Sequence, residues 1–189
     1  MKRYHLDILG INECRWTDSG KIRTQTGETI LFSGRKDNHH SNGVTIAISK
    51  EKAKTLYEWA PIYDRIITAR FWSKYIKTTL IQVYAPTNDA EEESKDNFYE
   101  QLQGVIDNNP GHDIIILTGD INAKVGNKQE GADGIVGKYG LHSERNDNGE
   151  RFASFCAINN FWQYLQQCLN IKTYTSRHGL HQMVNTRTR

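Results

Sequence analysis

Short apolar runs alternate with polar connections through the first half of the chain, a pattern typical of β-strands. The first run ends directly before Glu13, which predicts a buried strand with a carboxylate at its C-terminal end. The second and third runs flank a polar connection and predict a hairpin. The fourth and fifth, rich in β-branched and aromatic residues, predict another. The five predicted strands occupy residues 7–12, 29–33, 44–49, 65–72 and 78–84.

Between residues 90 and 108 the spacing of apolar residues changes to that of a helix. Acidic residues near its start suit the positive end of the helix dipole, so we interpret them as a solvated face. The inward face of this predicted helix carries Phe98, Leu102, Val105 and Ile106.

The second half of the chain adds a buried strand at 114–117, a glycine-rich loop and a second helix. Asp147 and Glu150 have the spacing of a capping box ahead of that helix. Strands interleaved with helices, and antiparallel pairs beside buried runs, predict an α/β fold with a mixed sheet. No convincing pattern is found beyond residue 170. Inward positions of the second helix are Phe152, Phe155 and Cys156.

The composition is that of one globular domain over residues 1–189, with 1–6 and 170–189 poorly defined. No apolar stretch approaches the roughly 20 residues that span a bilayer, and Asp7 interrupts the first apolar run. Neither a transmembrane segment nor a signal peptide is therefore expected. The 3 cysteines are widely spaced and form no CxxC pair, which indicates a reduced intracellular compartment, nuclear or cytoplasmic.

The formal net charge of +2 is too close to balance to indicate a nucleic-acid partner by itself. Its distribution is more informative. No aspartate or glutamate follows Glu150, and the basic residues in that region favour contact with a phosphate backbone. They are Arg151, Lys172, Arg177, Arg187 and Arg189.

Polar or acidic side chains follow three of the predicted strands, at positions where α/β folds commonly build their sites. Glu13 follows the first strand, Tyr84 ends the fifth, and Asp120 and Asn122 come directly after the strand at 114–117. A magnesium ion needs only one or two carboxylates when a phosphate supplies further oxygens. Each residue alone is better explained as a turn residue or a half-buried aromatic, but the set predicts hydrolysis of a phosphodiester.

Longer motifs surround these residues. They are Asp7–Trp16 (DILGINECRW), Gly43–Ile48 (GVTIAI), Gln82–Thr87 (QVYAPT), Gly119–Gly126 (GDINAKVG) and Asn146–Arg151 (NDNGER). In this order they resemble the endonuclease/exonuclease/phosphatase superfamily, and most closely the endonucleases of RTE- or BovB-type non-LTR retrotransposons and the craniofacial development protein 2-like proteins. The resemblance covers roughly residues 7–160. It implies the DNase-like fold, an α/β four-layer sandwich with mixed, largely antiparallel β-sheets, incomplete here.

The resemblance also implies roles. Glu13 would be the ligand of Mg²⁺ or Mn²⁺, and Tyr84 would orient or stabilise the phosphate. Asp120 and Asn122 would position and activate the attacking water. Weaker substrate-binding assignments fall on Thr87, Asn146 and Arg151, of which the last two are equally compatible with a helix start and a solvated arginine.

Several residues that the resemblance implies have no counterpart. The family carries an asparagine on a strand well before the glutamate, whereas Glu13 stands close to the first residue. The family's late aspartate and closing aspartate–histidine pair are also absent, since no carboxylate follows Glu150. His178 and His181 remain in that region, and residues 173–179, which contain His178, resemble a diverged version of one of the family's last motifs. We therefore expect a domain truncated at both ends, with weak or no activity.

Three functions follow from the sequence. The first is a Mg²⁺-dependent endonuclease-like domain acting on DNA, with no membrane partner and no small-molecule cofactor. The second is a nucleic-acid-binding remnant without catalysis, and the third is a phosphatase or lipid phosphodiesterase of the same fold. The sequence leaves the DNA specificity, the oligomeric state and the origin of the truncation open.

Overall fold

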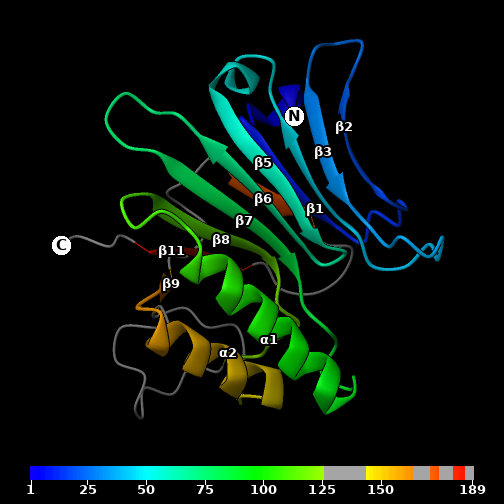
Figure 1. The fold of residues 1–189 in the computed structure, drawn as a ribbon, viewed down its shortest axis with the longest axis vertical. Coiled ribbons are helices and arrows are strands. Elements are labelled where there is room, and N and C mark those ends of the chain that lie inside the picture. The colour runs from blue at the N-terminus through cyan, green and yellow to red at the C-terminus, as the bar shows by residue number, and fades with distance from the viewer. Residues whose placement is uncertain (126–143, 164–170, 175–180, 186–189) are drawn as a thin grey trace.

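A computed structural model describes residues 1–125, 144–163, 171–174 and 181–185. In these residues two β-sheets lie face to face, and two α-helices cover the outer face of the larger sheet (Figure 1). The smaller sheet has the strand order β10-β1-β4-β3-β2 and the larger one the order β5-β6-β7-β8-β11-β9. Most neighbouring strands are antiparallel, while β1 with β10 and β7 with β8 are parallel.

The strands of the smaller sheet are β1 (Ile8–Asn12), β2 (Ser19–Arg23), β3 (Thr29–Ser33), β4 (Val44–Ile48) and β10 (Ile171–Tyr174). Those of the larger sheet are β5 (Leu56–Tyr63), β6 (Ile66–Phe71), β7 (Thr78–Tyr84), β8 (Ile114–Asp120), β9 (Trp162–Gln163) and β11 (His181–Asn185). The helices are α1 (Glu92–Asp107), α2 (Asp147–Ile158) and the 3-10 turns η1 (Lys2–Tyr4) and η2 (Lys52–Thr55).

The expected α/β fold with mixed, largely antiparallel sheets is confirmed. Both predicted hairpins form, β3 with β4 and β6 with β7. The sequence pattern does not predict β2 or β5, because both are largely exposed edge strands without a regular apolar alternation. It also does not predict β10 and β11, which lie beyond residue 170.

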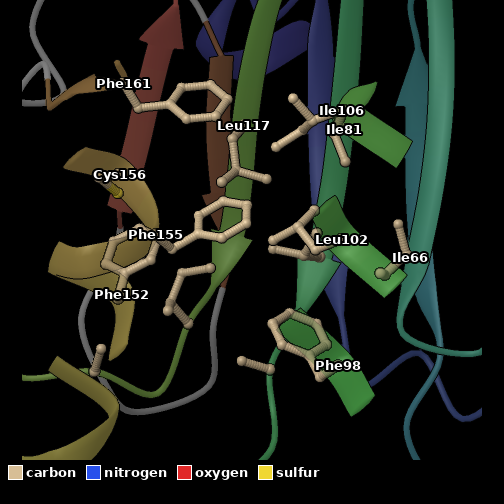
Figure 2. Close-up of a cluster of buried hydrophobic side chains, with 14 of the residues drawn as sticks. Ile66, Ile81, Phe98, Leu102, Ile106, Leu117, Phe152, Phe155, Cys156 and Phe161 are labelled. Carbon is tan, nitrogen blue, oxygen red and sulfur yellow. The ribbon is translucent and has the colours of Figure 1, made fainter. Parts of the chain in front are cut away.

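Two layers of apolar side chains hold the sheets and helices together. Between the sheets, Leu31 and Ile46 of the smaller sheet pack with Ile67 and Leu80 of the larger one. On the outer face of the larger sheet, α1 and α2 bury their apolar faces against β7 and β8 (Figure 2). As predicted, the helices contribute Phe98, Leu102, Ile106, Phe152, Phe155 and Cys156 to this layer, with Val105 at its margin.

The start of α2 differs from the prediction. Asn146, rather than Asp147, is the N-cap, and its side chain accepts a hydrogen bond from the backbone N–H of Gly149 at 2.8 Å. The same oxygen accepts a hydrogen bond from the N–H of Lys124 at 2.9 Å. It therefore also links the segment after β8 to the start of α2. Glu150 instead forms an ion pair with Arg145.

Neither of the two helices in the described part of the chain has the length and apolarity that crossing a bilayer requires.

Candidate functional site

Three strand ends meet at the candidate site. β7 and β8 run in parallel and their last paired residues are Tyr84 and Asp120. The backbone N–H of Ala85 donates to the Asp120 carbonyl at 2.8 Å and extends this pairing beyond the strands. Glu13 reaches the same place from the other sheet, directly after β1. The strand-end positions predicted from sequence are therefore close together in space.

Glu13 and Tyr84 are joined across the two sheets. The Tyr84 hydroxyl donates a hydrogen bond to Glu13 Oε1 at 2.7 Å. Glu13 has a left-handed backbone (φ 53°), which turns the chain sharply where β1 ends. The guanidinium of Arg65 also contacts Tyr84. Its Cζ lies 5.2 Å from the centroid of the Tyr84 ring, and its Nη1 donates a hydrogen bond to the Tyr84 carbonyl. Tyr84 is thus held at both its ring and its hydroxyl.

Burial, the hydrogen bond to Glu13 and the negative charges of Glu13 and Asp120 raise the pKa of Tyr84 to about 12. The hydroxyl consequently remains a proton donor throughout the neutral and mildly alkaline range. Because the folded-state pKa is raised, this stabilisation is fully present below the unfolded tyrosine pKa, about 10. It is lost as the pH rises through about 12.

We expect the absorbance of Tyr84 to titrate near pH 12. The measurement is the ultraviolet titration of the protein minus that of Tyr84→Phe, which isolates this phenol from the other tyrosines. A difference curve centred near the ordinary tyrosine pKa of about 10 would contradict the buried, carboxylate-bonded position.

Asp120 and Asn122 are joined by the turn that follows β8. The backbone N–H of Asn122 donates to Asp120 Oδ1 at 2.9 Å, and Asn122 Nδ2 donates to the Ala85 carbonyl at 2.8 Å. Asn122 has a left-handed backbone (φ 51°), a conformation that asparagine tolerates well. The Asp120 residue is only 8% exposed, so its carboxylate sits in a largely desolvated position.

Sequence reasoning did not assign a role to Asn12 and Gln82, a buried pair behind the site. Gln82 Nε2 lies 2.6 Å from the Asn12 side-chain amide. When the side-chain oxygen and nitrogen of Asn12 exchange places, the hydrogen bonds to its neighbours are satisfied. The oxygen then accepts from the Asp120 N–H at 2.8 Å, and the nitrogen donates to the Val83 carbonyl at 3.1 Å. Polar residues inside an apolar strand were the available sequence signal. The pair ties β1 to both strands that carry the other site residues.

Asn148 was likewise not assigned. It is 2% exposed, and its Nδ2 donates to the carbonyls of Pro86 at 3.0 Å and Asn122 at 3.1 Å. It therefore connects the start of α2 to the segments that follow β7 and β8.

The structure places the three weaker candidates differently. Thr87 is exposed on the segment after β7. Asn146 caps α2, and Arg151 forms ion pairs with Glu92, Asp96 and Asp147 on the helical surface. These contacts, that with Asp96 foremost, raise the pKa of Arg151. Asn146 thus lies at a helix start, and Arg151 lies on the helical surface.

The last motifs lie only partly within the described residues. His178 lies outside them. β11 pairs antiparallel with β8 and places residue 181 opposite Gly119, one position from Asp120 along that strand.

A metal ion at this site would have few protein ligands. Within residues whose placement is described, no group of three or more histidine, cysteine, aspartate and glutamate side chains is arranged to hold a metal. Glu13 is exposed and its carboxylate is oriented by Tyr84, so it presents one hard oxygen ligand to solvent. That donor set fits Mg²⁺, which keeps several waters and takes oxygens from a bound phosphate. It does not fit a zinc site.

No protein-family model matches the chain. Craniofacial development protein 2 from Bos taurus is 35% identical over 183 residues, which are 95% of this chain and 30% of that protein. The Tragulus javanicus protein of the same name is 34% identical over 183 residues, 95% of this chain and 31% of that protein. The chain thus spans about a third of the length of these curated relatives.

Two solved structures share the fold. The endonuclease domain of TRAS1, a telomere-specific non-LTR retrotransposon, has a TM-score of 0.54 at 15% identity, covering 82% of this chain and 64% of that one. The AP endonuclease LMAP from Leishmania major has a TM-score of 0.59 at 11% identity, covering 96% of this chain and 70% of that one. The resemblance and the DNase-like α/β fold expected from the sequence are confirmed, and the chain has a nuclease-like fold.

Proposed function

We propose that this nuclease-like domain hydrolyses DNA phosphodiester bonds with Mg²⁺ or Mn²⁺, at a low rate. The observation that carries the proposal is the hydrogen bond between Tyr84 and Glu13 across the two sheets, next to Asp120. It brings an exposed carboxylate, a protonated phenol and a buried carboxylate to neighbouring strand ends, groups that can hold a divalent ion, donate a proton and accept one.

Each residue has a chemical role in this proposal. Tyr84, protonated to about pH 12, stabilises negative charge that develops on a phosphoryl oxygen. Asp120, fixed by the Asn122 N–H, accepts the proton of the attacking water. The Glu13 carboxylate would hold the ion, which when bound neutralises charge on the phosphate and the leaving oxygen.

We infer the low rate from the residues at hand. Residues 151–189 contain no aspartate or glutamate, so within this chain the acid–base work falls to Asp120 and Tyr84. Loss of one general acid or base typically costs about 10²–10⁴-fold. We therefore expect slow nicking rather than rapid degradation.

A plasmid-nicking assay with purified protein and Mg²⁺ tests the proposal. Asp120→Ala and chelation by EDTA are each expected to reduce nicking to background, because proton transfer and charge neutralisation are both required. The matched control is Asp107→Ala at the end of α1, an exposed carboxylate that should leave the rate unchanged.

Three outcomes would contradict the proposal. Nicking that survives EDTA or Asp120→Ala would point to a contaminating nuclease. A folded protein that binds DNA in a salt-sensitive manner and never nicks it would be a binding module. Faster turnover of small phosphate esters than of DNA would indicate a phosphatase.

A further inference from the structure

The opposite end of the larger sheet carries a second surface of distinct chemistry. Residues 50–57 run through η2 into β5, and residues 72–77 form the turn between β6 and β7. The backbone N–H of Trp72 donates to the Thr55 carbonyl at 2.8 Å, so the two segments are adjacent. We call them together the basic aromatic surface. It lies at the start of β7, whereas Tyr84 lies at its end (Figure 1).

Three aromatic side chains on this surface are unusually exposed. Tyr57 is 51% exposed, Trp72 50% and Tyr75 86%. Tyr57 and Trp72 pack edge to face, with ring centroids 5.1 Å apart and planes at 85°. This contact fixes the orientation of two large rings, while about half of each residue remains exposed to solvent. Such exposure is uncommon for aromatic residues whose role is to fill the hydrophobic core.

Cations accompany these rings. Lys77 Nζ lies 4.3 Å from the Trp72 centroid and 4.9 Å from that of Tyr57, and Lys74 Nζ lies 5.0 Å from that of Tyr75. No ion pair within 4.0 Å links either lysine to a carboxylate of the residues described here. In the part of the chain that the structure describes, both ammonium groups therefore lie against aromatic rings, with no carboxylate at ion-pair distance.

The charge balance of the surface is positive. The two segments contain five lysines and one acidic residue, Glu51. Acidic neighbours from packed elements are Glu58 and Asp113, which pair with Arg70, and Asp7, which pairs with Lys52. The lysines are Lys50, Lys52, Lys54, Lys74 and Lys77.

We propose that the basic aromatic surface binds single-stranded nucleic acid, at a site separate from the candidate active site. Unpaired bases stack on exposed aromatic rings, and lysines beside those rings contact the phosphates. A duplex would use only the cations, since its bases are already stacked on each other. An acidic peptide would also use the cations but would leave three exposed rings unexplained.

The test is the binding of a fluorescently labelled oligo-dT of about 12 nucleotides to the full chain, with EDTA present to suppress cleavage. Fluorescence anisotropy gives the Kd over a range of salt concentrations. Trp72→Ala is expected to raise the Kd about 5- to 100-fold, because one stacking platform is lost. Lys74→Glu/Lys77→Glu is expected to weaken binding and reduce the salt slope by about 0.7 per lost phosphate contact.

Two controls keep this proposal distinct from the proposed function. Lys21→Glu/Arg23→Glu on β2 changes the net charge equally, at exposed positions of the other sheet. Asp120→Ala removes the candidate catalytic carboxylate. Both control variants should bind oligo-dT with the Kd of the unmodified chain. A loss of nicking without a loss of oligo-dT binding would therefore count against the proposed function alone.

The proposal is wrong if Trp72→Ala and Lys74→Glu/Lys77→Glu, shown to be folded by circular dichroism, bind oligo-dT as tightly as the unmodified chain. It is equally wrong if Lys21→Glu/Arg23→Glu weakens binding as much as Lys74→Glu/Lys77→Glu, because net charge alone would then explain the affinity. Tighter binding to duplex DNA that does not depend on Trp72 would also overturn it.

Discussion

Gly119→Ala is expected to lower the free energy of unfolding by about 3–5 kcal/mol and to abolish any nicking. Gly119 has a φ of 135°, which side chains rarely adopt, and an added Cβ would lie 1.9 Å from the Val83 carbonyl oxygen. The three atoms nearest to this Cβ, the Val83 carbonyl oxygen, carbonyl carbon and amide nitrogen, all belong to the backbone of β7, so a side-chain rotation cannot relieve the clash. β8 would have to move away from β7 at the residue before Asp120.

Gly104→Ala is the matched control for this experiment. Gly104 lies inside α1, and an added Cβ there would meet nothing within 4 Å. The same substitution should therefore raise the free energy of unfolding by about 0.5–1 kcal/mol, because alanine reduces the entropy of the unfolded chain. Urea unfolding followed by circular dichroism measures both variants. Equal effects of the two substitutions would contradict the tight approach of β8 to β7.

Asp113→Ala is expected to lower the free energy of unfolding by about 3–5 kcal/mol. The Asp113 carboxylate is buried and accepts hydrogen bonds from Arg70 Nη2 and Thr79 Oγ1, both at 2.9 Å. Its removal would leave the Arg70 guanidinium, whose side chain is 16% exposed, without its main partner. The control is Asp37→Ala, which removes the partner of Arg35 from a solvent-exposed ion pair and should change the urea midpoint little.

Asp113 also predicts how stability depends on pH. Burial of the carboxyl opposes ionisation, but the hydrogen bonds from Arg70 and Thr79 prevail and lower its pKa. The associated stabilisation is fully present above the unfolded aspartate pKa of about 3.9 and is lost as the pH falls through the lower folded value. The difference in unfolding free energy between the unmodified chain and Asp113→Ala should therefore shrink in acid. A constant difference down to pH 2 would contradict this explanation.

Local sequence patterns predicted the strand ends better than the surroundings of the site. Glu13, Tyr84 and Asp120 were identifiable because each follows an apolar run, and a run and its last polar residue are contiguous in sequence. Asn12 and Gln82 were not, because their contact depends on how two sheets stack, which no local pattern encodes. Their amides were visible only as polar residues in otherwise apolar strands.

For the two helices as well, the sequence pattern predicted the buried side chains but not their polar contacts. The apolar spacing of α1 and α2 predicted which side chains are buried, since a helix face follows from its period alone. It did not predict that Asn146 caps α2, since several polar residues precede that helix and only one has the required backbone geometry. It also left Arg151 with two interpretations, and it did not predict the ion pairs that Arg151 forms with three carboxylates on the helical surface.

Under the proposed function, the hydrogen bond between Glu13 and Tyr84 would make catalysis depend on both sheets and not on one. Glu13 belongs to the smaller sheet and Tyr84 to the larger, and Gly10 lets the Gln82 side chain fill the space between them, where an added Cβ would lie 2.1 Å from its Oε1. A slight slide of one sheet over the other would separate the two functional groups and leave each sheet intact. Enlarging or trimming remote interlayer side chains such as Leu31 or Ile46 would then silence the chemistry before the protein unfolds. If the domain has the proposed activity, its inactive variants should therefore include many that still fold.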